Sequence, residues 1–253
     1  MKTCVISLTS ATARRANIVA QFTNHQVSFD FFDAVTPSDV LQHIKRVDIP
    51  EFVLNCGRPP LETELACYAS HLALWRECAS GDVPYVIIED DAQLGESFRD
   101  GYQVVRHTIS SLGFLRLSIP NTTSNSADHE PELVFCSKVP LLSLAYALTP
   151  KAAQRLVEAS ATVEQPVDKF LQQYWRHQEL IYAISPPVVS LSEHADVSDI
   201  GVRRRPIPSL GLRLRRVFRR STNSIVRKTY SLAAKRRAAR SLARAEQALR
   251  HCL

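Results

Sequence analysis

Three consecutive carboxylates, Glu89, Asp90 and Asp91, are the side chains of this sequence whose spacing most clearly suggests chemistry. They directly follow an apolar run, Tyr85-Val86-Ile87-Ile88. Adjacent acids repel one another and are costly to bury unpaired, and a bound divalent cation would relieve that cost. Such a cation would also contact an anionic ligand, for example a diphosphate. The alternative is a solvated turn at the end of a strand, which fits this stretch equally well.

The strand that precedes the acids must position them. Its four apolar residues, three of them β-branched, predict a central strand that is covered on both faces. A first buried strand is predicted at 4–8, a helix at 11–22 and a second strand at 27–32. Prolines cluster between residues 36 and 60, and this predicts an irregular segment.

Apolar periodicity over the rest of the body predicts further strands and helices in alternation. Helices are expected at 62–79, 98–112, from 150 onward and at 165–174, and strands at 114–119, 133–137, 141–148 and 181–184. We expect the last of these strands at an edge of the sheet. The alternation predicts an α/β fold, with one catalytic domain over residues 1–200 and a tail over residues 201–253.

The length of 253 residues is enough for one hydrophobic core. The fractions of hydrophobic residues, 45%, and of charged residues, 22%, are those of an ordinary globular protein. No run approaches the roughly 18 apolar residues of a membrane-spanning helix. The apolar stretch 4–8 is too short for the core of a secretion signal, so we expect a cytoplasmic protein. The six cysteines show no CxxC pairing, which argues against a structural zinc and a disulfide framework.

The net charge of +6 conceals a division of the chain into two parts. Residues 201–253 contain 16 Lys and Arg against the single acid Glu246, a net charge of +15. Residues 1–200 contain 15 basic and 24 acidic residues, a net charge of −9. The basic character therefore belongs to the tail and not to the catalytic body.

Apolar residues in the tail recur at helical spacing among the arginines, at Leu210, Leu214, Val217, Phe218, Ile225 and Leu232. A basic amphipathic helix of this kind binds anionic membrane surfaces, so we expect residues 203–253 to hold the protein on the inner face of a membrane. A disordered basic tail is the structural alternative, and contact with nucleic acid phosphates is the functional one. Few aromatic residues lie between the charges, which makes nucleic acid the less favoured partner.

Five further residues could bind a ligand, although each also has a structural explanation. Arg14 follows the first strand and could bind a diphosphate, but a lone surface arginine is more common. Asp33 ends the second strand and could cap a turn instead. His71 lies within an amphipathic helix, and Asp168 could simply cap a helix N-terminus. His194 is a possible third metal ligand beside the carboxylates.

Several short blocks occur in a characteristic order and spacing between about residues 3 and 200. They are Ser7-Leu8 with Arg14-Arg15, Phe32-Asp33-Ala34, Glu64 to His71 with Trp75, Ile88 to Ala92, Ala145-Tyr146, Ala152-Ala153, Pro166-Val167-Asp168 and His194 to Ile200. Together they resemble glycosyltransferase family 25, which comprises bacterial lipooligosaccharide galactosyltransferase-like enzymes and the related collagen galactosyltransferases.

The resemblance implies a GT-A-like nucleotide-binding domain with a mixed central sheet. It also implies an inverting transferase that uses a UDP-sugar, with galactose as the expected sugar, and Mn²⁺ or Mg²⁺. By resemblance, Glu89, Asp91 and His194 would bind the metal. The residues that match donor-pocket positions are Arg14, Asp33, Glu64, Ser70, His71 and Asp90. Asp168 matches the Pro-Val-Asp motif, either as the catalytic base or as a ligand of the donor sugar.

The chemistry of sugar transfer fits these assignments. A metal would stabilise the negative charge that develops on the departing diphosphate. A base would remove the proton from the attacking acceptor hydroxyl, on the face opposite the leaving group. The sequence departs from the family pattern twice, with Thr63 in place of Gly and Leu142-Ser143 in place of Gly-Thr. The second departure puts a bulkier side chain near the expected acceptor or donor-sugar side, so the sugar specificity of other members is not carried over.

Two other functions compete with a glycosyltransferase acting on a lipid-linked or glycan acceptor such as lipooligosaccharide. One is a metal-dependent phosphoryl-transfer or hydrolytic enzyme, for which the sequence offers no evident nucleophile or Walker-type loop. The other is a non-enzymatic basic adaptor for a membrane or nucleic acid, with a degenerate catalytic body. Binding of a sugar nucleotide by the first 200 residues would exclude the adaptor.

Overall fold

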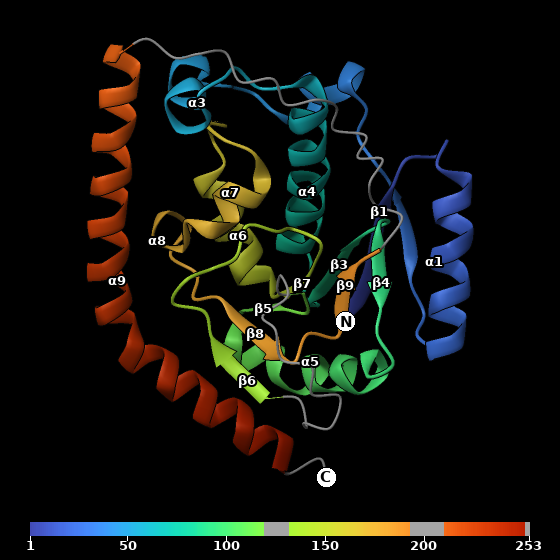
Figure 1. The fold of residues 1–253 in the computed structure, drawn as a ribbon. Helices are drawn as coiled ribbons and strands as arrows, with labels where there is room; N and C mark the ends of the chain where they lie inside the picture. The colour runs from blue at the N-terminus through green and yellow to red at the C-terminus, as the bar shows by residue number, and fades with distance from the viewer. Residues whose placement is uncertain (119–131, 193–209, 251–253) are drawn as a thin grey trace.

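A mixed seven-stranded sheet forms the centre of the computed structural model, which describes residues 1–118, 132–192 and 210–250. Its strands are β1 (Lys2–Ser7), β2 (Asp30–Asp33), β3 (Tyr85–Glu89), β5 (Phe114–Arg116), β6 (Glu132–Phe135), β7 (Ala145–Leu148) and β8 (Tyr182–Ser185). They lie in the order β2-β1-β3-β7-β5-β8-β6 (Figure 1). The α/β class and the mixed sheet that we predicted are thus confirmed.

Strand direction changes at the middle of the sheet. β1 is parallel to both β2 and β3, whereas β7 runs antiparallel to β3 on one side and to β5 on the other. β8 is parallel to β5 and antiparallel to β6. The prediction that residues 181–184 form an edge strand is therefore wrong, because β8 lies between β5 and β6 and its side chains are mostly buried.

Helices cover both faces of the sheet (Figure 1). α1 (Thr12–His25) and α5 (Phe98–Leu112) supply the core on one face, and α4 (Glu62–Ser80), α6 (Pro150–Ala159), α7 (Val167–Gln172) and α8 (Tyr174–His177) lie on the other. Alternate β3 residues enter the two cores, since Val86 and Ile88 pack with α1 and α5 while Tyr85 and Ile87 pack with α4. The prediction of a strand buried on both faces is confirmed.

The segment between residues 36 and 60 is more regular than its prolines suggested. It contains a 3-10 turn, η1 (Pro37–Asp39), followed by α2 (Val40–His43) and α3 (Ile49–Cys56). Asp48 caps α3, because its carboxylate accepts a hydrogen bond of 3.0 Å from the backbone N–H of Glu51. Pro50 lies in the first turn of α3, where its missing N–H costs nothing.

A second, two-stranded sheet carries the chain past the acidic triplet. β4 (Ala92–Leu94) begins directly after Asp91 and pairs antiparallel with β9 (Val189–Leu191). The Ser192 N–H, at the end of β9, donates a hydrogen bond of 2.9 Å to the backbone carbonyl of Asp91. This ribbon holds the acids at the end of β3 in a fixed position.

The basic tail forms one long helix, α9 (Leu210–Arg250), which packs against α3, α5, α8 and β6 and runs along the outside of the molecule (Figure 1). Small residues make its buried face, namely Ser231, Ala234, Ala238 and Ala245. All six apolar residues of the predicted stripe are exposed, from 59% for Val217 to 73% for Leu210. The prediction of a basic helix with an apolar stripe is confirmed for residues 210–250.

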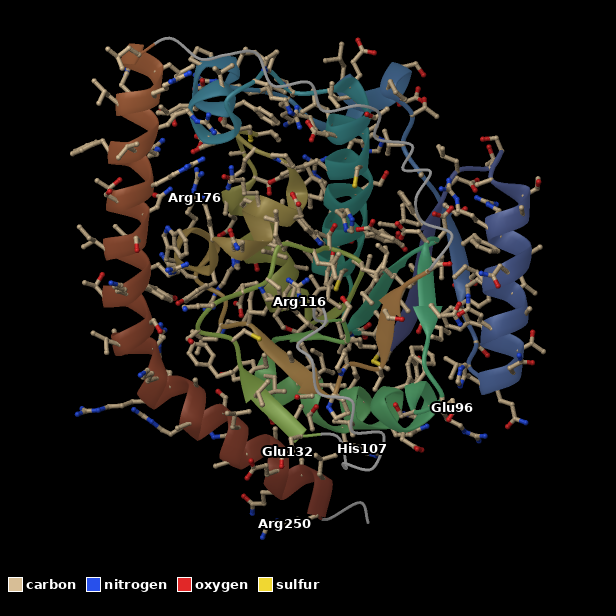
Figure 2. The ribbon with its side chains drawn as sticks, in the orientation of Figure 1. Glu96, His107, Arg116, Glu132, Arg176 and Arg250 are labelled. Atoms are coloured by element: carbon tan, nitrogen blue, oxygen red, sulfur yellow. The ribbon has the colours of Figure 1, made fainter. Side chains whose placement is uncertain are left out.

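No helix within residues 1–118, 132–192 and 210–250 combines the length and the apolar content needed to cross a bilayer. Basic residues occur throughout α9, up to Arg250 at its end (Figure 2).

Candidate active site

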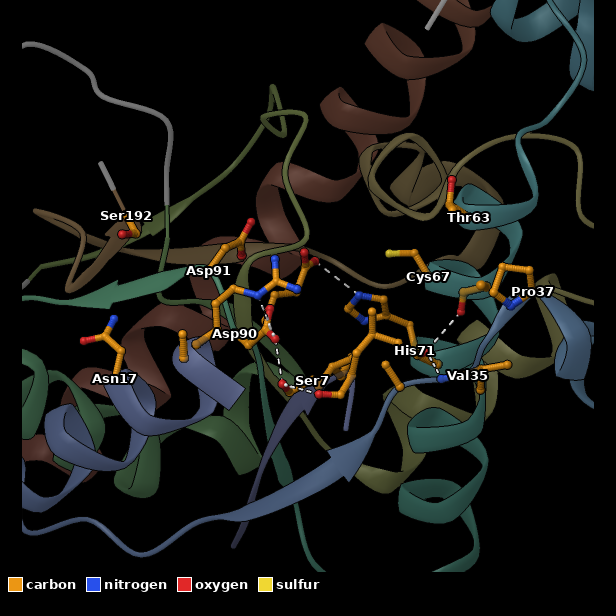
Figure 3. Close-up of a pocket in the computed structure, with 18 of the residues that line it drawn as sticks. Ser7, Asn17, Val35, Pro37, Thr63, Cys67, His71, Asp90, Asp91 and Ser192 are labelled. Carbon is orange, nitrogen blue, oxygen red and sulfur yellow. Dashed lines mark hydrogen bonds and ion pairs between the residues drawn. The ribbon is translucent and has the colours of Figure 1, made fainter. Parts of the chain in front are cut away.

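A pocket of about 520 Å³ opens at the carboxyl ends of β1, β2 and β3, the end of a parallel sheet at which ligands usually bind (Figure 3). Its walls come from the start of α1, the segment after β2, the first half of α4 and the acidic triplet. The structure brings together six of the predicted site residues in this lining: Arg14, Ser70, His71, Glu89, Asp90 and Asp91.

Glu89 is held by two hydrogen bonds at one carboxylate oxygen. Ser143, just before β7, donates to Oε1 at 2.5 Å, and His71 Nε2 lies 3.3 Å from the same atom. Burial opposes ionisation of Glu89, but the hydrogen bonds from His71 and Ser143 outweigh it and lower the pKa of this carboxyl. Glu89 is therefore an anion with a fixed orientation.

The position of His71 is fixed from the side opposite Glu89. Tyr146 accepts a hydrogen bond of 2.8 Å from Trp75 Nε1, and its hydroxyl lies 2.7 Å from His71 Nδ1. Because an ionised Glu89 can only accept, His71 donates to it through Nε2, while Nδ1 forms its hydrogen bond with the Tyr146 hydroxyl. A chain of four side chains thus runs from the core to the pocket.

Asp90 faces α1. Its Oδ2 accepts a hydrogen bond of 2.6 Å from the Ser7 hydroxyl and lies 3.3 Å from Arg14 Nε. The side chain of Arg14 is 34% exposed, against 12% for Asp90. Arg14 therefore belongs to the pocket lining and lies beside a carboxylate that orients its guanidinium. Figure 3 labels Asp90 and Ser7, the partners on this side of the pocket.

Asp91 differs from its two neighbours because one of its oxygens is buried without a hydrogen bond. Within the described part of the chain, Oδ1 has no hydrogen-bonding partner. Burial, together with the charges of Glu89 and Asp90, raises the pKa of Asp91 to about 7. A buried carboxylate oxygen that faces a pocket and has no partner fits a ligand of a divalent cation.

A sequence profile of the family described as "Glycosyltransferase family 25 (LPS biosynthesis protein)" matches residues 1–171. The chain belongs to glycosyltransferase family 25. The match runs from β1 into α7 and therefore includes every pocket-lining residue except Ser192. The family resemblance that the sequence blocks carried is confirmed.

Several curated proteins align with part of the chain. The lipooligosaccharide biosynthesis protein lic2B of Haemophilus influenzae is 45% identical over 95 residues, which are 37% of this chain and 34% of the relative. The lacto-N-neotetraose biosynthesis glycosyltransferase LgtB of Neisseria gonorrhoeae is 41% identical over 98 residues, 38% of this chain and 34% of the relative. The chain thus spans about a third of the length of the curated relatives it matches.

Two acids that the family pattern places near the donor do not line the pocket in this family 25 chain. Asp33 forms an ion pair with Arg15, whose guanidinium also stacks 4.6 Å from the ring of Phe31. Glu64 is buried and forms a bidentate ion pair with Arg58, in which both guanidinium Nη atoms donate to the carboxylate. Both acids therefore hold arginines that support the pocket wall.

Ser70 does line the pocket, and it also serves a structural purpose. Its hydroxyl accepts a hydrogen bond of 2.9 Å from the Val35 N–H and donates one of 3.0 Å to the Ala66 carbonyl. These bonds attach the segment after β2 to α4. The position of one wall of the pocket therefore depends on Ser70.

Asp168 begins α7 and lies outside the pocket lining. One of its oxygens accepts a hydrogen bond of 2.7 Å from the Lys169 N–H. Burial and the charge of Glu89 are the main causes that raise the pKa of the Cys67 thiol, on the α4 side of the pocket. The charge of Asp168 contributes to the same rise. His194, the predicted third metal ligand, lies outside the described residues.

Three residues at the site were not predicted. Cys67 lines the pocket one helical turn before His71, and that i, i+4 spacing was readable in the sequence. Ser143 reaches Glu89 because β7 pairs with β3, and this pairing of distant segments cannot be deduced from the residues around Ser143. Arg116 is buried near the middle of the molecule (Figure 2) and donates to the carbonyls of Pro140 and Leu142, which holds the segment that carries Ser143. Burial lowers the pKa of Arg116 to about 10.

Proposed function

We propose that this chain is an inverting, metal-dependent glycosyltransferase that transfers a hexose, with galactose as the expected sugar, from a UDP-sugar to a lipooligosaccharide or another surface glycan. Membership of the family supports sugar transfer. The names of the two relatives support oligosaccharide acceptors of the lipooligosaccharide class. The single observation that carries the proposal is the buried, unpartnered Oδ1 of Asp91 in the pocket.

The donor set fits Mn²⁺ or Mg²⁺, because both cations prefer carboxylate oxygen. Asp91 would be the principal ligand and Glu89 the second, with His194 as the proposed third. The cation, when bound, would stabilise the charge of the departing diphosphate. Arg14 would bind the same phosphates, since its guanidinium lines the pocket and Asp90 holds it in orientation.

The remaining groups have supporting roles in this proposal. Ser70 and His71 shape the α4 wall of the donor pocket, and Asp33 and Glu64 hold Arg15 and Arg58 behind that pocket. Asp168 is the proposed base for the acceptor hydroxyl, approaching from the α7 side, with contact to the donor sugar as its alternative role. A GT-A-like donor domain is consistent with the mixed sheet and with the position of the pocket.

The outer face of α9 supports attachment to an anionic membrane surface, on the cytoplasmic side. At 100° per residue, the stripe from Leu210 to Leu232 occupies roughly 100° of the helix circumference. Exposed arginines flank it, among them Arg213, Arg215 and Arg220, and Lys228 lies within it. Each would contribute about 1 kcal/mol near anionic lipid, and the apolar stripe would enter the interface. A lipid-linked acceptor would be concentrated at the same surface.

Thermal unfolding with Mn²⁺ and a panel of nucleotide sugars tests the donor site. A ligand at a hundred times its Kd adds about 2.7 kcal/mol, which for this chain length raises the midpoint by roughly 5–10 °C. We expect a UDP-selective, Mn²⁺-dependent rise that Asp91→Asn abolishes and that Asp82→Asn, a change at an exposed acid outside the pocket, retains. No rise with any nucleotide in folded protein would contradict the proposal and favour the adaptor.

Co-sedimentation with vesicles tests the membrane surface. We expect the double variant Leu214→Ser/Phe218→Ser to lose binding to vesicles of anionic lipid while keeping its nucleotide-dependent thermal shift. Val19→Ser is the matched control, because Val19 is also an exposed apolar residue, 46% accessible, but lies on α1. Unchanged binding by the double variant would show that α9 is not the anchor.

A further inference from the structure

A second set of potential metal ligands lies beside the acidic triplet. Cys67 and His71 are one turn apart on the same side of α4 (Figure 3). Glu89, at the end of β3, lies beside them. The thiol sulfur, an imidazole nitrogen and a carboxylate oxygen all lie within 4.8 Å of one another. This set shares only Glu89 with the metal ligands proposed for sugar transfer.

The spacing of these atoms is close to that of a tetrahedral metal site. With metal–ligand distances of about 2.0–2.2 Å to nitrogen and oxygen, two ligands at a tetrahedral angle are separated by roughly 3.4 Å. His71 Nε2 and Glu89 Oε1 are 3.3 Å apart. Sulfur binds the metal at about 2.3 Å, so the thiol needs only a small side-chain movement to complete three ligands.

We infer that Cys67, His71 and Glu89 form a binding site for a thiophilic divalent cation of the Zn²⁺ class. Three protein ligands would leave a fourth position, which faces the pocket that Cys67 and His71 line. A thiolate and an imidazole select Zn²⁺ over Mn²⁺ and Mg²⁺, whereas the Asp91 carboxylate favours the harder cations. The two cations would therefore compete for Glu89 alone.

The surroundings of His71 can support a metal. Binding through Nε2 requires its proton on Nδ1, which would then donate to the Tyr146 oxygen 2.7 Å away. That oxygen has two lone pairs, and Trp75 Nε1 uses one of them. A ligating histidine normally makes such a hydrogen bond through its second nitrogen, and the bond fixes the orientation of the ring.

Titration of the chelator-treated full chain with Co²⁺ tests the site without an activity assay. A thiolate bound to Co²⁺ gives a charge-transfer absorption in the near ultraviolet, and Zn²⁺ should displace it. We expect the band in the native chain, its loss in Cys67→Ser, and its retention in Cys56→Ser, a change at another half-buried free cysteine. Tyr146→Phe should weaken Zn²⁺ binding by about 10–100-fold. Absence of the band, or a band that Cys67→Ser retains, would overturn the inference.

Two further measurements keep the test decisive. Asp91→Asn should keep the Co²⁺ band, although the proposed sugar-nucleotide site would be lost, so the two proposals fail independently. A band that Asp91→Asn abolishes would assign the cation to the acidic triplet and refute the site. If Cys67→Ser is poorly folded, alkylation of Cys67 in the native chain is measured instead, with and without Zn²⁺. We expect Zn²⁺ to protect the thiol, and an alkylation rate that Zn²⁺ does not change would refute the site.

Discussion

Glu64 allows a structural role to be separated from a direct role in donor binding. Its carboxylate accepts hydrogen bonds from Arg58 Nη1 at 2.7 Å, from Arg58 Nη2, and from the Leu61 N–H at 3.2 Å. The side chains of Arg58 and Glu64 are only 7% and 2% exposed. Glu64→Ala would leave the guanidinium of Arg58 buried without its carboxylate, retaining the 2.9 Å bond to the Pro59 carbonyl.

Removing one member of a buried ion pair typically lowers the free energy of unfolding by about 3–5 kcal/mol. For a chain of this length, that corresponds to a fall of roughly 10 °C in the unfolding midpoint. Replacing both partners, in Arg58→Met/Glu64→Leu, removes the uncompensated charge, so we expect most of the stability to return. Urea denaturation of the three proteins gives the free energies directly.

Binding of the donor then decides the role of Glu64. If this residue acts only by holding Arg58, the stable double variant should recover the UDP-dependent thermal shift. If Glu64 itself contacts the donor, the double variant should be stable but unresponsive. A loss of less than 1 kcal/mol in Glu64→Ala, or a double variant no more stable than the single one, would refute the ion-pair argument.

Three further predictions concern the elements that support the site. Tyr146→Phe leaves Trp75 Nε1 and His71 Nδ1 without their buried partner, so urea unfolding should show a loss of about 2–4 kcal/mol, and a loss below 1 kcal/mol would contradict the network. Burial lowers the pKa of His177 from 6.5 to about 4, so its stabilising contribution is present above pH 6.5 and is lost as pH falls towards 4. Between pH 7 and 4.5 the native chain should lose roughly 2–3 kcal/mol more than His177→Gln, and equal losses would refute this. Ala238→Leu should destabilise the buried face of α9 by about 1–3 kcal/mol in thermal unfolding, whereas Ala239→Leu on the exposed side should have little effect, and equal effects would contradict the packing.

Features of the fold that depend on neighbouring residues could be predicted from the sequence. The helix expected at 98–112 has the same bounds as α5, since its apolar residues repeat at helical spacing. The central strand and its acids were predicted because both lie in one continuous stretch, 85–91. By contrast, the short helix α3 has too few turns to produce a clear periodicity, and a proline in its first turn resembles a break.

Features that depend on pairing between distant segments could not be predicted. Glu89, Asp90 and Asp91 are all carboxylic acids, but their hydrogen-bonding partners differ. Ser143 donates to Glu89 and Ser7 donates to Asp90, whereas Oδ1 of Asp91 has no partner among the described residues. The position of β8 inside the sheet likewise depends on β6, which pairs with it from an earlier part of the chain.

The two adjacent arginines show the limit within a single helix. Successive residues point about 100° apart around a helix, so Arg14 and Arg15 face different neighbours. Arg14 lies in the pocket lining, and Arg15 turns towards Asp33. The sequence predicts that both arginines follow the first strand. It does not predict how the helix is rotated about its axis, and that rotation decides which of the two arginines lies in the pocket.

The antiparallel course of β7 separates two parts of the site along the chain. Because β7 runs against β3, the segment that enters β7 meets the carboxyl end of β3 at the same edge of the sheet. Ser143 must be kept, because it holds Glu89 at the end of β3. The residues before it can change in length and composition while the β1 and β2 ends of the pocket keep their own supports. If the proposed function holds, exchanging the residues before Ser143 is the change that would alter the acceptor side while leaving the proposed nucleotide side of the pocket intact.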